Sequence, residues 1–282
     1  MKELIQALPF IQQYRGKTMI IKYGGNAMIN SGLKTGVIQD LLFMSCVGIN
    51  VVLVHGGGPE IEAMLAATGK VSHFVNGLRY TDEETMEIVQ MVLCGKVNKD
   101  ITALIQMNQG RAVGLSGIDG GLLQAQRLIS DRGDLGFVGE IKTVNPGPLE
   151  LVLQSGAIPV VSSVAIGIGA DSGRALNINA DTAAAHIAGA LKAEKLLLMT
   201  DVPGLLRDVQ DPDSLIKTLG RTDLETLKKT GVIRKGMIPK AECCALALDQ
   251  GVKTVHIIDG RIPHALLAEI FTKEGIGTKC FS

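Results

Sequence analysis

Three glycine-containing segments at the ends of predicted strands are candidates for ligand binding. They are Lys22-Tyr23-Gly24-Gly25, His55-Gly56-Gly57-Gly58-Pro59 and Thr200-Asp201-Val202-Pro203-Gly204. Glycines between a strand and a helix expose backbone N–H groups, which hold anions or a transferring phosphoryl group, and a nearby lysine adds a point positive charge. The alternatives are a plain tight turn and, for Lys22, a lysine that snorkels from an edge strand.

These segments do not match the two common nucleotide-binding motifs. Gly56 and Gly58 give G-x-G, but the third glycine position of a dinucleotide fingerprint is occupied by Ile61. Gly16-Lys17-Thr18 resembles the end of a Walker A loop, yet the earlier glycine position is Ile11 and the segment precedes a predicted strand. The glycines therefore indicate anion binding without assigning either class.

Four polar residues stand near the starts of predicted helices, namely Arg79, Asn177, Asp181 and Lys240. An arginine can clamp a carboxylate through two parallel hydrogen bonds. An Asp or Asn at such a position is also a common N-cap, and a solvated surface charge is the alternative for Arg79 and Lys240. The histidines show no H-x-x-x-H spacing, so no histidine metal site is predicted.

The elements that must position these residues are typical of an α/β fold. Short apolar runs predict buried parallel strands at 19–22, 51–54, 112–115, 158–164, 196–199 and 254–258. Strand, turn and helix in this order predict an open, mainly parallel sheet whose ligands bind beyond the carboxyl ends of the strands. Two further runs, 122–125 and 137–141, predict an antiparallel flap.

Helix boundaries are predicted from caps, prolines and glycines. The segment from Thr81 to Glu84 reads as a capping box that opens a long helix toward Gln109. First-turn prolines are expected at Pro59, Pro148 and Pro263, and C-capping glycines at Gly48, Gly110 and Gly251.

Composition excludes several classes of protein. Lys plus Arg and Asp plus Glu number 28 each among 282 residues, so no net charge favours nucleic acid or an anionic membrane. No apolar stretch approaches the roughly 20 residues of a membrane span, and 1–17 lacks the features of a signal peptide. Five cysteines without a C-x-x-C pair argue against disulfides and zinc, and favour a reducing compartment.

Taken together and in order, the motifs resemble the acetylglutamate kinases of the amino acid kinase family. The matching stretches are KYGGNAM (22–28), HGGGPEI (55–61), NGLRYTDEETMEIVQMVLCGKVNK (76–99), FVGEI (137–141), NINADTAA (177–184), LMTDVPGLL (198–206), GMIPK (236–240) and HIIDGRIPHALLAEIF (256–271). They cover essentially the whole chain. The resemblance implies an open three-layer αβα sandwich with two lobes: 1–192 with the N-terminal helix and the acetylglutamate site, and 193–282 with the ATP site and a C-terminal arginine segment.

The resemblance also implies a reaction, in which MgATP phosphorylates the side-chain carboxylate of N-acetyl-L-glutamate in the second step of arginine biosynthesis. Lys22 and Lys240 match the two transition-state lysines, Asp181 the carboxylate that orients them, and Gly25 a backbone donor to the transferring group. The resemblance assigns acetylglutamate binding to Gly57, Gly58, Arg79 and Asn177, and ATP binding to Thr200, Asp201, Val202, Gly204, Leu205, Gly236 and Met237. Magnesium is carried by ATP, with no ligand from protein side chains.

The two ends of the chain resemble the arginine-inhibited members of the family. In these an N-terminal helix links dimers into a hexamer, a trimer of dimers, and arginine binds between that helix and the C-terminal segment. Glu269, Gly275 and Gly277 are the expected arginine contacts, with a helix that merely completes the domain as the alternative. Plant and cyanobacterial members also bind the PII signalling protein, and the resemblance leaves that partner open. The expected location is the cytoplasm, or the plastid stroma for a plastid-encoded chain.

Some residues depart from the family pattern. Lys235 replaces a common glycine, Ile118 a frequent lysine and His186 a frequent glutamate. Lys235 would border the nucleotide phosphates, where it would either strengthen ATP binding or stiffen the loop.

Two other classes stay open as alternatives. A nicotinamide oxidoreductase would share the parallel sheet, although the incomplete G-x-G-x-x-G counts against it. A non-catalytic arginine or nitrogen sensor would have no need for Lys22, Asp181 and Lys240 together.

Overall fold

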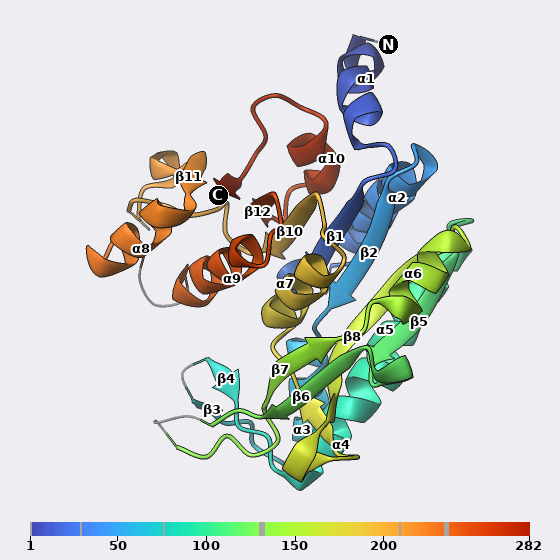
Figure 1. The fold of residues 1–282 in the computed structure, drawn as a ribbon, viewed down its shortest axis with the longest axis vertical. Helices are drawn as coiled ribbons and strands as arrows, with labels where there is room; N and C mark the ends of the chain where they lie inside the picture. Colours follow the sequence, from blue (N-terminus) through green and yellow to red (C-terminus); the bar gives the residue numbers. More distant parts are fainter. Residues whose placement is uncertain (1, 29, 76, 130–132, 209, 234–236) are drawn as a thin grey trace. The chain divides into compact units, whose positions relative to one another are not determined.

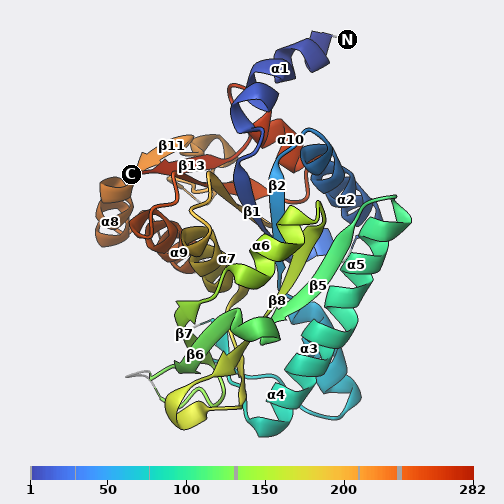
Figure 2. The ribbon, with the colours of Figure 1, turned by 45° about the vertical axis from the view of Figure 1, so that its right-hand side comes forward.

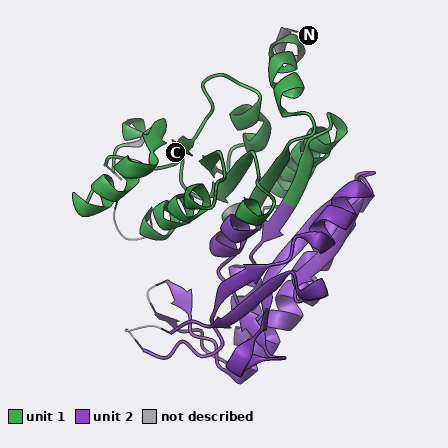
Figure 3. Cartoon of the chain, viewed as in Figure 1, with its two compact units in different colours: residues 1–52, 188–282 green, residues 53–187 purple. Residues whose placement is uncertain are grey.

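The six apolar runs predicted as strands are confirmed, and they belong to a mainly parallel sheet with helices packed around it (Figures 1 and 2). The computed structural model describes residues 2–28, 30–75, 77–129, 133–208, 210–233 and 237–282. The chain divides into unit 1, residues 1–52 and 188–282, and unit 2, residues 53–187 (Figure 3). The predicted lobes 1–192 and 193–282 are defined by their ligands and stay a prediction.

Unit 1 contains strands in the order β11-β13-β12-β10-β1-β2. They span Thr218–Gly220, Thr278–Phe281, Thr254–Asp259, Lys195–Thr200, Thr18–Tyr23 and Asn50–His55, the last strand continuing into unit 2. Its helical segments are α1 (Lys2–Tyr14), η1 (Gly25–Met28), α2 (Ser31–Cys46), η5 (Pro212–Ser214), α8 (Arg221–Lys229), α9 (Ile238–Asp249) and α10 (Ala265–Ile270). The pairs β1–β10 and β10–β12 are parallel, so their carboxyl ends meet at one edge.

Unit 2 is organised around β8 (Ile158–Gly167), most of whose residues are buried. Strands β2, β5 and β6 pair with it in parallel and β9 pairs antiparallel. The other strands are β3 (Phe74–Val75), β4 (Leu78–Arg79), β5 (Ala112–Gly117), β6 (Leu123–Arg127), β7 (Gly139–Val144) and β9 (Ala175–Asn177). The helical segments are α3 (Gly58–Ala67), α4 (Glu83–Gln90), η2 (Met91–Val97), α5 (Asn98–Met107), η3 (Asp119–Gly121), α6 (Gly147–Gln154), η4 (Gly169–Asp171) and α7 (Ala180–Ala190), which extends into unit 1.

The predicted flap is confirmed as an antiparallel hairpin of β6 and β7. It is also part of the main sheet, because β6 pairs in parallel with β8 through Gln124 and Ala125. The two short runs therefore correctly predicted that β6 and β7 pair with each other. The place of the hairpin in the main sheet depends on the pairing of β6 with β8, which is distant in sequence.

Three boundary predictions were wrong: the cap at Thr81, the first-turn position of Pro263 and the C-cap at Gly110. The N-cap of α4 is Asp82, whose carboxylate accepts from Thr85 N at 2.8 Å, because Thr81 Oγ1 donates instead to Arg79 O at 2.8 Å. The predicted long helix toward Gln109 is confirmed as α4, η2 and α5, and the sequence did not predict that η2 is π-helical. Pro263 lies before the N-cap His264 of α10 and so outside the first turn. After α5, the left-handed residue is Gln109, with φ 63°, and not Gly110 as predicted.

Within the described part of the chain, no helix combines the length and the apolar character that crossing a membrane would require.

Candidate functional site

The carboxyl edge of β1, β10 and β12 brings Lys22, Gly25 and Asp201 together in unit 1. Lys22 pairs in register with Leu198, two residues before the end of β10, so both strand ends open at the same level. A Cβ at Gly25, where φ is +72°, would lie 2.7 Å from Asp201 Oδ1. Glycine is favoured here, since another residue would be strained at this backbone angle and would displace the Asp201 carboxylate.

Lys22 lies over its own glycine turn. Its Nζ is 2.7 Å from the point that a Cβ at Gly24 would occupy, and the residue is half-buried. The glycine pair therefore leaves space for the ammonium group as well as for the bend of the chain. The predicted grouping of a positive charge with a glycine turn is present at the end of β1.

The predicted ATP-binding residues 200–205 form a tight turn after β10. Thr200 Oγ1 donates to Val202 O at 3.0 Å and accepts from Val202 N at 3.1 Å, and Leu205 N donates to Thr278 Oγ1 at 2.9 Å. Thr278 was not predicted, because its partner lies 73 residues away in the sequence.

Met237 is the N-cap of α9 and Lys240 is half-buried in the first turn of this helix. Helix α9 packs against β12, in the same unit as Lys22. Gly236 and the departing residue Lys235 lie outside the described residues.

Unit 2 holds the predicted acetylglutamate residues, beginning with the turn after β2. Gly57 is the N-cap of α3, and Gly58 with Pro59 forms the first turn. A Cβ at Gly57 would lie 2.7 Å from Leu93 Cδ2 and 3.2 Å from Val97 Cγ2. The π-helical segment η2 therefore packs directly against this turn and excludes a side chain from it.

Arg79 is buried beside the same turn, so the solvated-charge alternative for it was wrong. Its Nη2 lies 3.4 Å from both Gly58 O and Glu62 Oε1, its Nη1 donates to Ser72 Oγ, and its guanidinium lies 4.7 Å from the centre of the Phe74 ring. Burial lowers the pKa of Arg79, an effect that the Glu62 carboxylate opposes. The structure thus brings Arg79 and Gly58 together.

Thr81 connects Asn177 with the chain at Arg79. Asn177 Nδ2 donates to Thr81 Oγ1 at 3.1 Å, and Thr81 Oγ1 donates to Arg79 O at 2.8 Å. Thr81 is fully buried and was interpreted from sequence as a helix cap. Nothing in its local sequence distinguishes the two roles, because its partner Asn177 lies 96 residues away.

Asp181 stands in the first turn of α7 and is buried. The cap of this helix start is Asn179, whose Oδ1 accepts from Asp181 N at 2.9 Å and from Thr182 N at 3.1 Å. The interpretation of Asp181 as an N-cap was therefore wrong. Asp181 lies in unit 2, whereas Lys22 and Lys240 lie in unit 1.

The three expected arginine contacts form one cluster in unit 1. Glu269 Oε2 accepts from Ile276 N at 2.6 Å and Gly277 N at 2.9 Å, and a Cβ at Gly275 would lie 2.8 Å from the same oxygen. Burial raises the pKa of Glu269, but the hydrogen bond from His256 and those from the backbone outweigh it, so the pKa is lowered overall.

His256 and Lys195 extend this cluster and were not predicted. His256 Nδ1 lies 2.6 Å from Glu269 Oε1, and Lys195 Nζ lies 3.1 Å from His256 Nε2 and 5.0 Å from the centre of the Tyr14 ring. Burial lowers the pKa of Lys195 to about 8, with a further contribution from the charge on Lys279. The sequence signals for these two residues were a lysine at the start of the apolar run of β10 and a histidine within the apolar run of β12.

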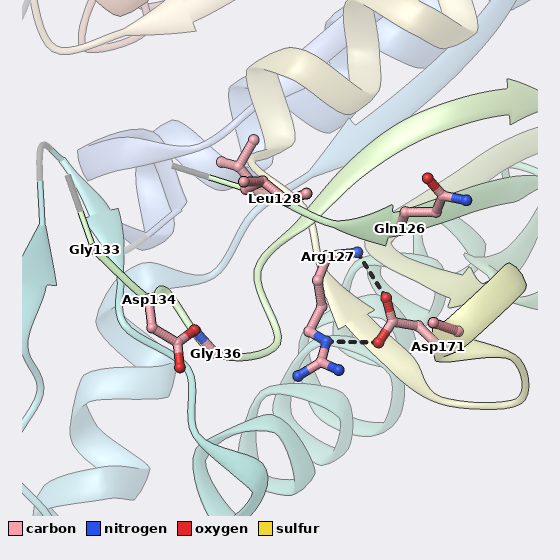
Figure 4. A pocket seen from close by; sticks show the side chains of 9 residues that line it. Gln126, Arg127, Leu128, Gly133, Asp134, Gly136 and Asp171 are labelled. Atoms are coloured by element: carbon pink, nitrogen blue, oxygen red, sulfur yellow. Dashed lines mark hydrogen bonds and ion pairs between the residues drawn. The ribbon is translucent and has the colours of Figure 1, made fainter. Parts of the chain in front are cut away.

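A separate pocket of about 500 Å³ in unit 2 contains none of the predicted site residues (Figure 4). Arg127 and Asp171 form one part of its polar lining, with Arg127 Nε 2.6 Å and Arg127 N 2.9 Å from the Asp171 carboxylate (Figure 4). Because this carboxylate is engaged by both donors, the pair holds the end of β6 in place.

Within the described ranges, no three or more His, Cys, Asp or Glu side chains are grouped so that they could hold a metal ion.

Comparison with known proteins assigns the chain to a family. The family model described as "Amino acid kinase family" matches residues 17–259. Acetylglutamate kinases from Clostridium kluyveri and Desulfitobacterium hafniense are 53% and 55% identical over 99% and 98% of this chain, covering 98% and 94% of those proteins.

Solved structures agree with the family model. One is N-acetylglutamate synthase from Neisseria gonorrhoeae, complexed with coenzyme A and N-acetyl-glutamate, with a TM-score of 0.86 and 28% identity. The match covers 100% of this chain and 63% of that protein. Carbamate kinase from Giardia lamblia shares the fold, with a TM-score of 0.69 and 17% identity over 95% of this chain and 99% of its own. The chain belongs to the amino acid kinase family and, within it, to the acetylglutamate kinases.

Proposed function

We propose that this protein transfers the γ-phosphoryl group of ATP to the side-chain carboxylate of N-acetyl-L-glutamate, giving N-acetyl-L-glutamyl 5-phosphate and ADP in arginine biosynthesis. The observation that carries the proposal is identity of 53–55% with acetylglutamate kinases along 98–99% of the chain. The grouping of Arg79, Gly58 and Asn177 in unit 2 supports an acceptor site for an anionic substrate.

The proposed step needs no general base, because the acceptor carboxylate is already an anion. One carboxylate oxygen attacks the γ-phosphorus, the bond to the β,γ-bridging oxygen breaks, and the electron pair leaves with ADP. Catalysis of such a transfer consists of positioning and of stabilising charge on the equatorial oxygens. When bound, magnesium carried by ATP neutralises phosphate charge, and no protein side chain ligates it in this proposal.

The residues of unit 1 supply positive charge and donors in this proposal. Lys22 and Lys240 neutralise charge that develops on the transferring group, and Gly25 N–H donates to it. The 200–205 turn and the start of α9 bind ATP. The clearance around Gly24 and Gly25 supports this role, since a side chain at either would collide with Lys22 or Asp201.

The residues of unit 2 hold the acceptor. Arg79 pairs with a substrate carboxylate, Gly57 and Gly58 present backbone N–H groups, Asn177 donates from its amide, and Asp181 orients the two lysines. Arg79 is already held by Ser72, Glu62 and Phe74, so little side-chain entropy is lost when substrate binds.

ATP-dependent formation of an acyl phosphate, trapped with hydroxylamine, tests the proposal. The hydroxamate should form with N-acetylglutamate and not with free glutamate. A hydroxamate with free glutamate alone would reassign the substrate, and no signal with either acceptor would refute kinase activity.

Arginine is the proposed feedback inhibitor, and a hexamer built as a trimer of dimers is the proposed assembly in the cytoplasm. Helix α1 exposes Ile5 and Leu8, with 65% and 49% of their surface accessible, which supports its use in an interface. Removal of residues 1–14 should reduce the hexamer to dimers in analytical ultracentrifugation and abolish arginine inhibition. A hexamer that persists without this helix would refute the proposed interface.

A further inference from the structure

His55 is a fully buried imidazole at the end of β2, next to the glycine turn. Its Nδ1 lies 2.8 Å from Gly56 O and its Nε2 lies 3.1 Å from Asn98 Nδ2. A carbonyl oxygen only accepts, so Nδ1 must carry the proton. The ring is then neutral, with Nε2 as an acceptor for the Asn98 amide.

Asn98 is the polar neighbour of the other ring nitrogen of His55, and it places an amide nitrogen there. Its Nδ2 also lies 3.0 Å from Leu115 O and 2.8 Å from Val160 O, while its Oδ1 accepts from Lys99 Nζ at 3.0 Å. Two carbonyl acceptors and one ammonium donor leave a single orientation for the amide, with its nitrogen toward the histidine. Because Nδ2 has two hydrogens and three acceptors, the N–H that faces His55 Nε2 is shared with one of the carbonyl oxygens.

The π-helical segment η2 places this amide beside the glycine turn. The backbone N–H of Asn98 donates to Leu93 O, five residues earlier. Leu93 and Asn98 then face the same turn, Leu93 at the position of a Gly57 Cβ and Asn98 at the His55 ring. Single π-helical turns are frequent at functional sites.

We infer that His55 is a positioning residue, which holds the Gly56–Gly57 peptide so that the Gly57 N–H points away from the buried imidazole and toward bound substrate. In a trans peptide the C=O and the following N–H point in opposite directions, and the described chain contains no cis peptide. Anchoring Gly56 O on Nδ1–H thus determines the direction of the Gly57 N–H.

This role rests on the proposed function, in which Gly57 N–H donates to the acceptor. A donor aimed in advance needs no reorganisation during the reaction, which is the main source of electrostatic catalysis. Lys99 is the charged group that acts on His55 from α5, and its positive charge disfavours a second proton on the ring.

The protonation state can be tested without any assay of activity. A long-range ¹H–¹⁵N spectrum of the full-length protein should show His55 with a protonated Nδ1 and an unprotonated Nε2, unchanged from about pH 5 to 8. A signal from a protonated Nε2 in this range would overturn the inference. Failure of the kinase assay would refute the proposed function and leave this result intact.

Two substitutions separate the roles of the ring nitrogens. In His55→Asn the amide N–H lies near the position of Nδ1 and retains a donor for Gly56 O, whereas His55→Gln reaches the Nε2 position and loses that donor. His55→Gln should lower kcat by roughly 10- to 100-fold, below the full loss of one oxyanion donor, with the acetylglutamate KM within about threefold. His55→Asn should recover kcat to within about threefold of wild type.

Thermal unfolding of both variants shows whether they fold. An equal decrease of kcat in the two folded variants would overturn the positioning role. Wild-type kcat in His55→Gln would overturn it as well. If neither variant folds, the spectrum of the wild-type protein still decides the tautomer on which the inference depends.

Discussion

Arg79 shows how a single side chain is prepared to bind an anion. It is buried, yet Ser72, Glu62, Gly58 O and the Phe74 ring all contact its guanidinium group. One of these contacts is the Glu62 carboxylate, whose place a substrate carboxylate could take. The geometry therefore suits binding more than chemistry.

Arg79→Ala should raise the acetylglutamate KM far more than it lowers kcat. A hydrogen bond to a charged group is worth about 1.5–3 kcal/mol, equivalent to roughly 10- to 150-fold in affinity. Steady-state kinetics with varied acetylglutamate measures this, with Arg221→Ala on α8 as a surface control expected to leave KM unchanged. An unchanged KM with a lower kcat would move Arg79 to the chemical step.

Lys240→Ala should show the opposite pattern. Loss of one electrostatic stabiliser of the transition state lowers kcat by roughly 10²–10³, with little change in the acetylglutamate KM. Lys253→Ala, whose side chain is 65% exposed, is the matched control and should behave as wild type. Near-normal turnover of the Lys240 variant would refute its role.

At the scale of elements, η2 is the feature with the clearest consequence. Its i→i+5 register turns both Leu93 and Asn98 toward the segment His55 to Gly57. An α-helical register would rotate one of them away, because it changes the angle between residues five apart.

Deleting Gly95 should convert η2 to a tighter register and lower kcat by about tenfold or more, since small misplacements near the reacting groups cost up to about 10²-fold. Gly95→Ala keeps the register and is the matched control. Apart from its chain neighbours and the backbone of its own helix, nothing lies within 4 Å of a Cβ at Gly95. The control should therefore keep wild-type kcat and gain up to about 1 kcal/mol of stability. Equal kcat in both variants would contradict the importance of the π-helical register.

At the scale of the whole molecule, buried neutral histidines make stability depend on pH. Burial lowers the pKa of His55 from 6.5 to about 4, and also lowers the pKa values of His186 and His256. Between about pH 6.5 and 4 the unfolded chain therefore binds more protons than the folded chain. The stability that these neutral histidines contribute is fully present above about pH 6.5 and is lost as the pH falls toward 4.

For His55 alone the predicted loss is on the order of 3 kcal/mol over this interval. Urea unfolding at several pH values measures it, with His55→Asn as the comparison because it has no proton to gain. The difference in unfolding free energy between the wild type and this variant should shrink as the pH falls from about 6.5 to 4. A constant difference would contradict the lowered pKa.

The sequence alone determined six central strands, the flap, the glycine turns and the family, because these depend on local patterns. Consecutive apolar residues predict a buried strand at 196–199 whatever its neighbours are, and Gly24-Gly25 marks a close approach of the backbone. Only the tertiary structure decided the partners of the polar side chains. Thr81 bonds Asn177 across 96 residues and Asn98 bonds His55 across 43. Such contacts leave no periodicity in the sequence, because a polar group's partner is chosen by the packing of distant elements and by the cost of burying it without one.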